Sequence, residues 1–166
     1  MLKRFFTTSS SGTLTLLRVV LGVVMMAHGS QKLLGLFGGY GYEGTIGFFH
    51  GMGISTFVGT LVIIGEFFGG LGLVTGFLTR LSAAGVAAVM AGAVYMVHFP
   101  NGFFMNWFGQ QAGEGYEFHL LVLAMTVMLA VRGGGWASAD AWIARHLSAP
   151  HTAPAGARKR DLVASH

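Results

Sequence analysis

Residues 14–36 read LTLLRVVLGVVMMAHGSQKLLGL, and this stretch decides how the rest of the chain is interpreted. It carries no formal charge between Arg18 and Lys32, so it predicts a helix that crosses the roughly 30 Å hydrocarbon layer of a membrane. His28 and Lys32 are four residues apart and share one helix face, with Met25 one turn below them. Because lipid is a costly environment for a histidine and a lysine, we expect this face to point into a bundle of helices.

The composition of the whole chain is that of a membrane protein. Of 166 residues, 53% are hydrophobic and only 10% are charged, and the mean hydropathy is +0.64. Soluble domains carry about 25% charged residues. We interpret the formal net charge of +4 as a topology signal and expect no nucleic-acid binding. The chain has no cysteine, so its own side chains supply no disulfide, thiol or iron–sulfur chemistry, and a redox role requires an external cofactor.

Four apolar runs have the length and composition of transmembrane helices, at about residues 14–35, 54–78, 81–99 and 116–132. The connectors 35–53 and 100–116 are rich in glycine and aromatic residues, which suit the membrane interface. We therefore predict an all-α membrane protein, a four-transmembrane-helix bundle with aromatic interfacial connectors on the outer side.

The two ends of the chain differ from this apolar centre. Residues 1–13 are basic and then rich in Ser and Thr, and they are predicted to be a cytoplasmic N-terminal segment. A signal peptide is the less consistent alternative, because no clean cleavage site comes after the apolar run. Residues 14–147 form the predicted membrane domain, which ends in a short amphipathic helix at 138–147. Residues 148–166 are rich in Pro, Ala, His and basic residues and are predicted to be a disordered basic tail.

The basic residues predict the orientation in the membrane. In a four-span protein, nine of the ten Lys and Arg residues lie on one side and only Lys32 lies on the other. Because basic residues are retained on the cytoplasmic side, both termini are predicted to be cytoplasmic in a multi-pass protein of the bacterial inner membrane. The nine residues of the majority side are Lys3, Arg4, Arg18, Arg80, Arg132, Arg145, Arg158, Lys159 and Arg160.

Glu66 is the one charged residue in the second apolar run, and it lies on a glycine-rich helix face. Small residues four apart let helices approach closely in lipid. Two such pairs occur, at 65–69 and 72–76. Because Gly69 lies on the Glu66 face, the sequence predicts that replacing Gly69 by Leu destabilises the bundle more than replacing Gly76 by Leu.

Helical phase and topology together predict a polar pocket in the outer half of the bundle. His28 and Lys32 rise to the outer leaflet, His98 ends the third helix at the same level, and Glu66 lies at mid-depth as the floor. Glu117 and His119 are two residues apart, so they differ by about 200° around the fourth helix and only one of them faces the pocket.

Six stretches of the chain resemble the DoxX family of small bacterial membrane proteins over roughly residues 14–141. The stretches are RVVLGVVMMAHGSQKLLG at 18–35, EGTIGFFHGMG at 43–53, IGEFFGGLGLVTGFLTRLSA at 64–83, HFPNGFF at 98–104, GYEFHLL at 115–121 and GGGWASAD at 133–140. The segment MNWFGQQAGEG at 105–115 departs from the family pattern as a longer insertion.

The resemblance implies which polar residues belong to the family's pattern. It favours Glu117 over His119 as the inward residue, and Lys32 and Glu117 are then expected to be charge-coupled across the pocket. Arg18 and Asp140 are expected to pair, holding the end of the fourth helix to the first. By position the matching residues are Arg18, His28, Lys32, Glu66, Arg80, His98, Glu117 and Asp140.

Three classes of function fit these residues. The resemblance implies a quinone-linked redox accessory subunit, because the family is named after a subunit associated with thiosulfate:quinone oxidation. Imidazole and ammonium groups then hydrogen-bond quinone oxygens, and Glu66 or Glu117 passes protons. The alternatives are a structural or assembly subunit of a membrane complex and a small-solute or proton transporter. We expect no covalent cofactor, and a metal site is disfavoured because no His-x3-His or HExxH spacing occurs. Expected partners are the lipid bilayer and other membrane or redox subunits.

Overall fold

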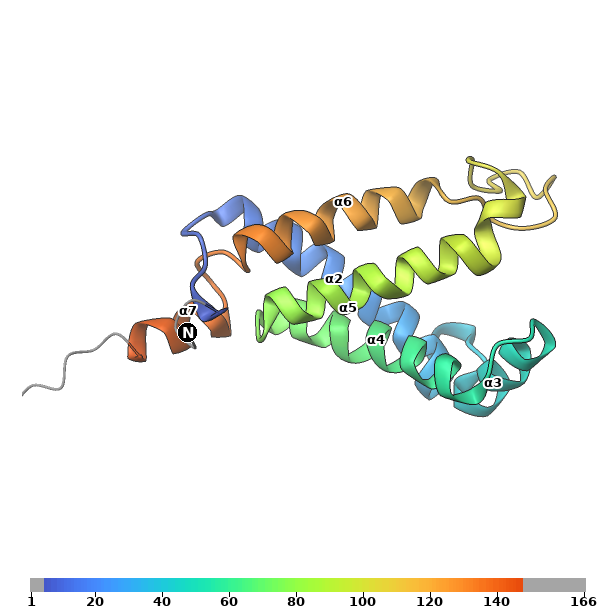
Figure 1. Cartoon of the computed structure of the whole chain (residues 1–166), viewed down its shortest axis with the longest axis horizontal. Helices are drawn as coiled ribbons and strands as arrows, with labels where there is room; N and C mark the ends of the chain where they lie inside the picture. Colours follow the sequence, from blue (N-terminus) through green and yellow to red (C-terminus); the bar gives the residue numbers. More distant parts are fainter. Residues whose placement is uncertain (1–4, 148–166) are drawn as a thin grey trace, which may run out of the picture.

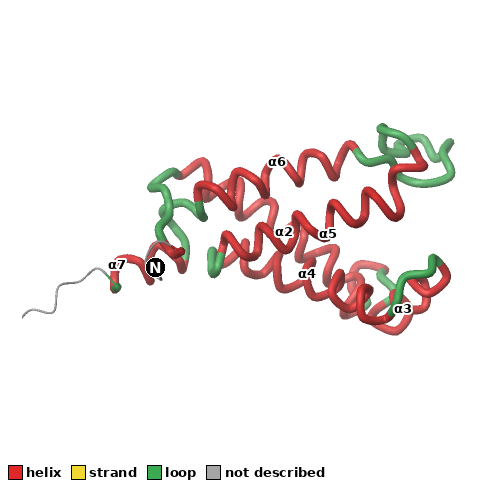
Figure 2. Tube along the Cα trace, in the orientation of Figure 1, coloured by secondary structure: helices red, strands yellow, loops and turns green. Residues whose placement is uncertain are grey.

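The computed structural model describes residues 5–147, and this part of the chain is all helical and contains no strand. The helices run roughly parallel or antiparallel to one long axis (Figures 1 and 2). The six α-helices are α2 (Gly12–Leu34), α3 (Gly41–Gly51), α4 (Thr56–Thr75), α5 (Thr79–Ala93), α6 (Glu117–Arg132) and α7 (Ala139–His146). The predicted tail 148–166 lies outside the described residues.

Three helical segments are long and apolar enough to cross a membrane. They are Gly12–Leu34, Thr56–Thr75 and Thr79–Asn101, with mean hydropathies of 1.5, 2.0 and 1.6. The third combines α5 with a π-helical turn η2 (Val94–His98) and a 3-10 turn η3 (Phe99–Asn101). The predicted fourth helix is present as α6, but its 16 residues reach only about 24 Å at 1.5 Å per residue.

Local sequence explains where the long helices begin and end. Ser11 and Ser55 precede α2 and α4, and each side-chain oxygen accepts a hydrogen bond from a backbone N–H in the first turn. Gly35 and Gly76 end the same helices in the left-handed conformation that glycine adopts without strain. The apolar runs between these signals therefore form continuous helices.

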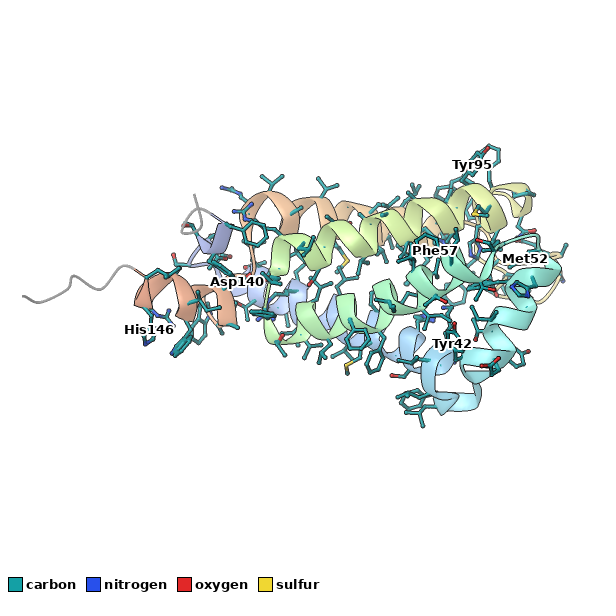
Figure 3. All side chains as sticks on the ribbon, turned by 60° about the horizontal axis from the view of Figure 1, so that its bottom comes forward. Tyr42, Met52, Phe57, Tyr95, Asp140 and His146 are labelled. Atoms are coloured by element: carbon teal, nitrogen blue, oxygen red, sulfur yellow. The ribbon has the colours of Figure 1, made fainter. Side chains whose placement is uncertain are left out.

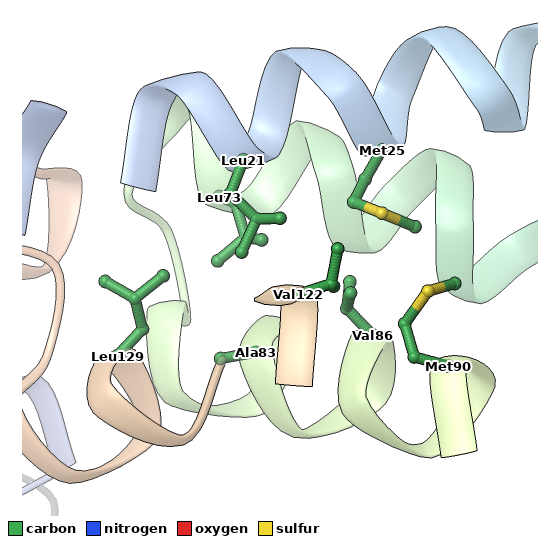
Figure 4. Close-up of a cluster of buried hydrophobic side chains, with 8 residues drawn as sticks. All are labelled: Leu21, Met25, Leu73, Ala83, Val86, Met90, Val122 and Leu129. Atoms are coloured by element: carbon green, nitrogen blue, oxygen red, sulfur yellow. The ribbon is translucent and has the colours of Figure 1, made fainter. Parts of the chain in front are cut away.

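Four helices meet in one apolar core. Side chains from α2, α4, α5 and α6 converge there, and Figure 4 shows the fully packed set: Leu21, Met25, Leu73, Ala83, Val86, Met90, Val122 and Leu129. A second cluster packs α3 and the residue after its turn, Ile54, against Ile63 of α4. Many apolar side chains on the opposite helix faces are exposed, as expected for helices in contact with lipid.

Glycines allow α2 and α4 to touch through their backbones. A Cβ on Gly70 would lie 2.4 Å from the backbone nitrogen of Met26, and one on Gly22 would lie 2.6 Å from that of Val74. Contacts this short leave no room for a side chain. The closest helix–helix contact of the fold therefore depends on small residues on both helices.

The expectation that Gly69 is more sensitive than Gly76 is wrong on this geometry. A Cβ on Gly69 would meet one flexible side-chain atom of Val86 at 2.9 Å. Gly76 instead has φ of 69° and would place a Cβ 2.4 Å from Ser138. A larger residue at Gly76 would therefore have an unfavourable positive φ and would also collide with Ser138.

We predict that Gly70→Ala destabilises the folded protein by about 1–3 kcal/mol, because the added methyl collides with backbone rather than a movable side chain. Gly85→Ala on α5 is the matched control, since no atom lies within 4 Å of its added Cβ. Thermal unfolding in detergent, followed by circular dichroism, measures both variants. Equal unfolding temperatures would contradict the close contact of α2 and α4.

Both connectors between spans lie at one end of the long axis, and α7 lies at the other (Figure 1). Figure 3 shows the same separation, with Tyr42 and Met52 at the first end and Asp140 and His146 at the second. Lys32 lies in the last turn of α2, and His98 lies in η2, which follows α5. Both residues are therefore at the connector end.

Candidate functional site

A buried ion pair joins the last turn of α2 to α4. Lys32 Nζ donates a hydrogen bond to Glu66 Oε2 over 2.5 Å, and the two side chains are 28% and 6% exposed. The helix crossing sets this register, because Gly29 of α2 lies against the backbone of Phe67, the residue after Glu66. The expected Lys32–Glu117 coupling is therefore wrong: the carboxylate that meets Lys32 is Glu66.

Two histidines from different helices lie with their rings in contact near this pair. The rings of His98 and His119 have centroids 4.1 Å apart at an interplanar angle of 40°. His28 and Lys32 lie close enough to His119 for their charges to act on its imidazole. His28 is itself exposed, and its ring lies 6.1 Å from that of Phe118. Three histidines thus lie near the Lys32–Glu66 pair.

His119 carries an unusual buried nitrogen. Its side chain is 6% exposed, and Nδ1 has no hydrogen-bond partner in the described structure. A buried polar atom without a partner costs about 1–3 kcal/mol, so such atoms are uncommon, and Thr79 Oγ1 and Arg80 Nε are the other two among the described residues. The neighbouring histidine, His98, does have a partner, because its Nδ1 lies 2.8 Å from the carbonyl oxygen of Glu114.

The π-helical turn η2 (Val94–His98) positions His98. A π turn inserts one extra residue into a helix and rotates the residues after it, and it occurs often at functional sites. The apolar pattern predicts one regular α-helix that ends at His98, and a regular helix gives this residue a different phase. The structure keeps His98 at the helix end but turns its ring onto His119.

Glu117 does not face the bundle, so the choice of Glu117 over His119 as the inward residue is wrong. Its Oε1 accepts hydrogen bonds from the backbone N–H of Met105 at 3.1 Å and from Trp107 Nε1 at 3.3 Å. The carboxylate therefore fastens the second connector over the start of α6. Because Glu117 and His119 differ by about 200°, His119 takes the inward position.

The spacing of apolar residues along α6 could have identified His119 as the inward-facing residue. Its buried residues are His119, Val122, Thr126 and Leu129, spaced three, four and three apart as on one helix face. Tracing that apolar stripe backwards from Leu129 reaches His119 and not Glu117. The family pattern pointed the other way.

Arg18 and Asp140 do not form the expected ion pair. Arg18 is 1% exposed and donates hydrogen bonds only to backbone carbonyl oxygens, of Leu73, Val74, Gly134 and Ala137. Asp140 accepts the backbone N–H groups of Leu78 and Thr79 at 2.8 Å each. The guanidinium thus closes the C-terminal end of α4, and the carboxylate caps the N-terminal end of α5. Both groups are structural.

A cavity of about 260 Å³ adjoins the ion pair. It lies between the end of α2, the segment 35–41 and α3, and Lys32 is the member of the predicted site that lines it. Its other side-chain walls are Gln31, Tyr40, Thr45, Phe48 and Phe49, none of which the sequence pattern singles out. Within residues 5–147, no three His, Asp or Glu side chains are grouped closely enough to hold a metal ion.

Comparison with known proteins places the chain in a family. The DoxX family model matches residues 13–99. "Putative oxidoreductase CatD" of Bacillus subtilis (strain 168) is 30% identical over 132 residues, which cover 80% of this chain and 87% of that protein. No solved structure matches. The matched region contains Lys32, Glu66 and His98 together with nearly all of the three candidate spans, and the chain belongs to the DoxX family of membrane proteins.

Proposed function

We propose that this protein is a quinone-linked redox accessory subunit of the bacterial inner membrane, with a ligand site at the connector end of the bundle. The observation that carries the proposal is the Lys32–Glu66 pair, because Lys32 lines a cavity and the histidines His28, His98 and His119 lie nearby. The likeness to a relative named as an oxidoreductase supports it.

The side chains present fit a quinone. A bound quinone supplies two-electron redox chemistry that exchanges protons at two ring oxygens. Lys32 has three N–H donors and gives one to Glu66, so another is available to a ring oxygen. The unpartnered His119 nitrogen lies near the pair but outside the cavity lining, so we assign it to proton exchange. Electrons have to come from an electron-transferring partner subunit, because the chain has no cysteine for redox exchange.

Proton exchange is the role we propose for the remaining groups. Imidazoles change protonation near neutral pH more readily than any other side chain. The rings of His98 and His119 are in contact at a tilted angle, and His98 hydrogen-bonds to the second connector at Glu114. We therefore propose that the two histidines and Glu66 are the groups that exchange protons with the ligand.

The structural-subunit alternative has a specific observation in its favour. Arg18 and Asp140 show that the chain uses buried charged groups purely to hold helix ends. A structural role explains the Lys32–Glu66 pair equally well. Ligand binding therefore separates the two functions.

Native mass spectrometry of gently purified protein tests the proposal. We expect a co-purifying quinone, and we expect His28→Ala to weaken quinone binding, because His28 lies close enough to Lys32 and Glu66 for its charge to act on both. His28 is exposed, so the folded fraction should be unchanged. His50→Ala is the matched control, because His50 is an exposed histidine on α3 that bonds to Thr56. A protein that binds no quinone and whose His28→Ala variant is only less stable would favour the structural subunit.

The proposal includes a topology in which α6 is a fourth span and both termini are cytoplasmic. Its basis is the nine-to-one division of basic residues. Because the chain has no native cysteine, single cysteines report position without background. Cysteines at Gly47 and Gln111 are expected to react with an impermeant reagent from outside, and a cysteine at Trp136 only after permeabilisation. The reverse labelling pattern would overturn the orientation.

A further inference from the structure

We propose that the cavity beside Lys32 binds the head of a single-ring quinone or quinol, and that the segment 35–41 forms one wall of this binding site. The inference deepens the proposed function and rests on it. It assigns the ring to the cavity between the end of α2 and α3, which Lys32 lines and no histidine lines.

The size of the cavity limits the ligand. Sites for small molecules usually measure about 300–1,000 Å³. At about 260 Å³ this cavity suits one substituted six-membered ring, with any long apolar tail left in the surrounding lipid.

The walls have the chemistry that such a ring requires. Tyr40, Phe48 and Phe49 present aromatic faces and edges to the cavity. Lys32 brings its ammonium group, and Thr45 brings a hydroxyl that donates only a long bond of 3.3 Å to the Lys32 carbonyl oxygen. Gln31 adds an amide. Aromatic walls with a few polar donors and acceptors match a planar ring that carries oxygen atoms at opposite edges.

The segment 35–41 is held in a conformation that most residues avoid. Phe37 has φ of 52° although it is not a glycine, and Gly35, Gly38 and Gly41 also have positive φ. Residues in such conformations persist where the surroundings enforce them, and they concentrate at binding sites. Together with its neighbours, this segment wraps over the end of α2.

Two contacts fix the segment against α2. A Cβ on Gly39 would lie 2.2 Å from the carbonyl oxygen of Gln31, so the two backbones touch. The Gln31 side chain donates a hydrogen bond to the carbonyl oxygen of Phe37 at 3.2 Å. The same residue thus lines the cavity and anchors its wall, which positions Tyr40 at the cavity edge.

Duroquinone binding to the purified full-length protein in lipid nanodiscs, measured by isothermal titration calorimetry, tests the inference. Tyr40→Ala is the informative variant, because Tyr40 lines the cavity yet is 79% exposed, so its removal leaves the core intact. We expect its dissociation constant to rise about twofold to tenfold, the usual effect of losing one aromatic contact. Tyr40→Phe should bind as the unmodified protein does.

Tyr95→Ala is the matched control, since Tyr95 is 85% exposed and points away from the body of the molecule (Figure 3). Unchanged binding by Tyr95→Ala with weakened binding by Tyr40→Ala supports the inference. Duroquinone binding that is equally strong in both variants overturns the ring position but leaves the proposed function intact. No binding by the unmodified protein overturns both.

Discussion

Replacing Arg18 by methionine is expected to destabilise the folded protein by at least about 3 kcal/mol, one of the two largest single effects in this chain. The guanidinium is 1% exposed, and it donates to the carbonyl oxygens of Leu73, Val74, Gly134 and Ala137. Each buried carbonyl left without a donor costs about 1–3 kcal/mol, and methionine supplies none. The Leu73 carbonyl keeps the backbone N–H of Gly76, so the loss concerns chiefly the carbonyls of Val74, Gly134 and Ala137. Thermal or denaturant unfolding in detergent measures the loss.

A second variant at this position separates the effect of geometry from that of charge, and a variant at an exposed arginine is the control. Arg18→Lys keeps the charge but has one nitrogen in place of three, so it should recover only part of the lost stability. Arg145→Met removes an exposed arginine on α7 and should change the free energy of unfolding by less than about 0.5 kcal/mol. If Arg18→Met and Arg145→Met unfold alike, Arg18 does not hold the helix ends together.

The helices could be predicted closely because their signals are local. Apolar runs, serine caps and terminal glycines all lie within a few residues of the boundaries they determine. The expected helices at 14–35 and 54–78 correspond to Gly12–Leu34 and Thr56–Thr75. The π turn at Val94–His98 was missed, because one inserted residue leaves the apolar character of the run unchanged.

The partners of the polar residues could not be predicted in the same way. Which carboxylate meets Lys32 depends on where α2 crosses α4, and the contact between Gly29 and Phe67 sets that register. Arg18 and Asp140 lie at the same end of the bundle, as expected, yet each is satisfied by backbone groups of the turns between helices. The sequence placed Arg18 and Asp140 at the same end of the bundle, whereas contacts across the bundle selected their partners.

The second large effect concerns the Lys32–Glu66 pair, and the two single variants are expected to differ. Lys32→Met leaves the 6% exposed Glu66 carboxylate without its partner and should cost about 3 kcal/mol. Glu66→Gln should cost less, about 1–2 kcal/mol, because the Lys32 side chain is 28% exposed and its ammonium can turn towards water. Unfolding in nanodiscs measures both free energies.

The double variant Lys32→Met/Glu66→Gln then decides whether the pair is coupled. Its cost should fall short of the sum of the single costs by about 1–3 kcal/mol, since each single change leaves a group that the other change removes. Lys32→Met/Glu117→Gln is the control, because Glu117 bonds to Met105 and Trp107 and should be additive with Lys32 within about 0.5 kcal/mol. Coupling to Glu117 instead would show that Lys32 turns away from α4 in the membrane. A ligand oxygen at Lys32 would then have to compete with a carboxylate on α6, and the cavity on the α3 side would lose its ammonium group.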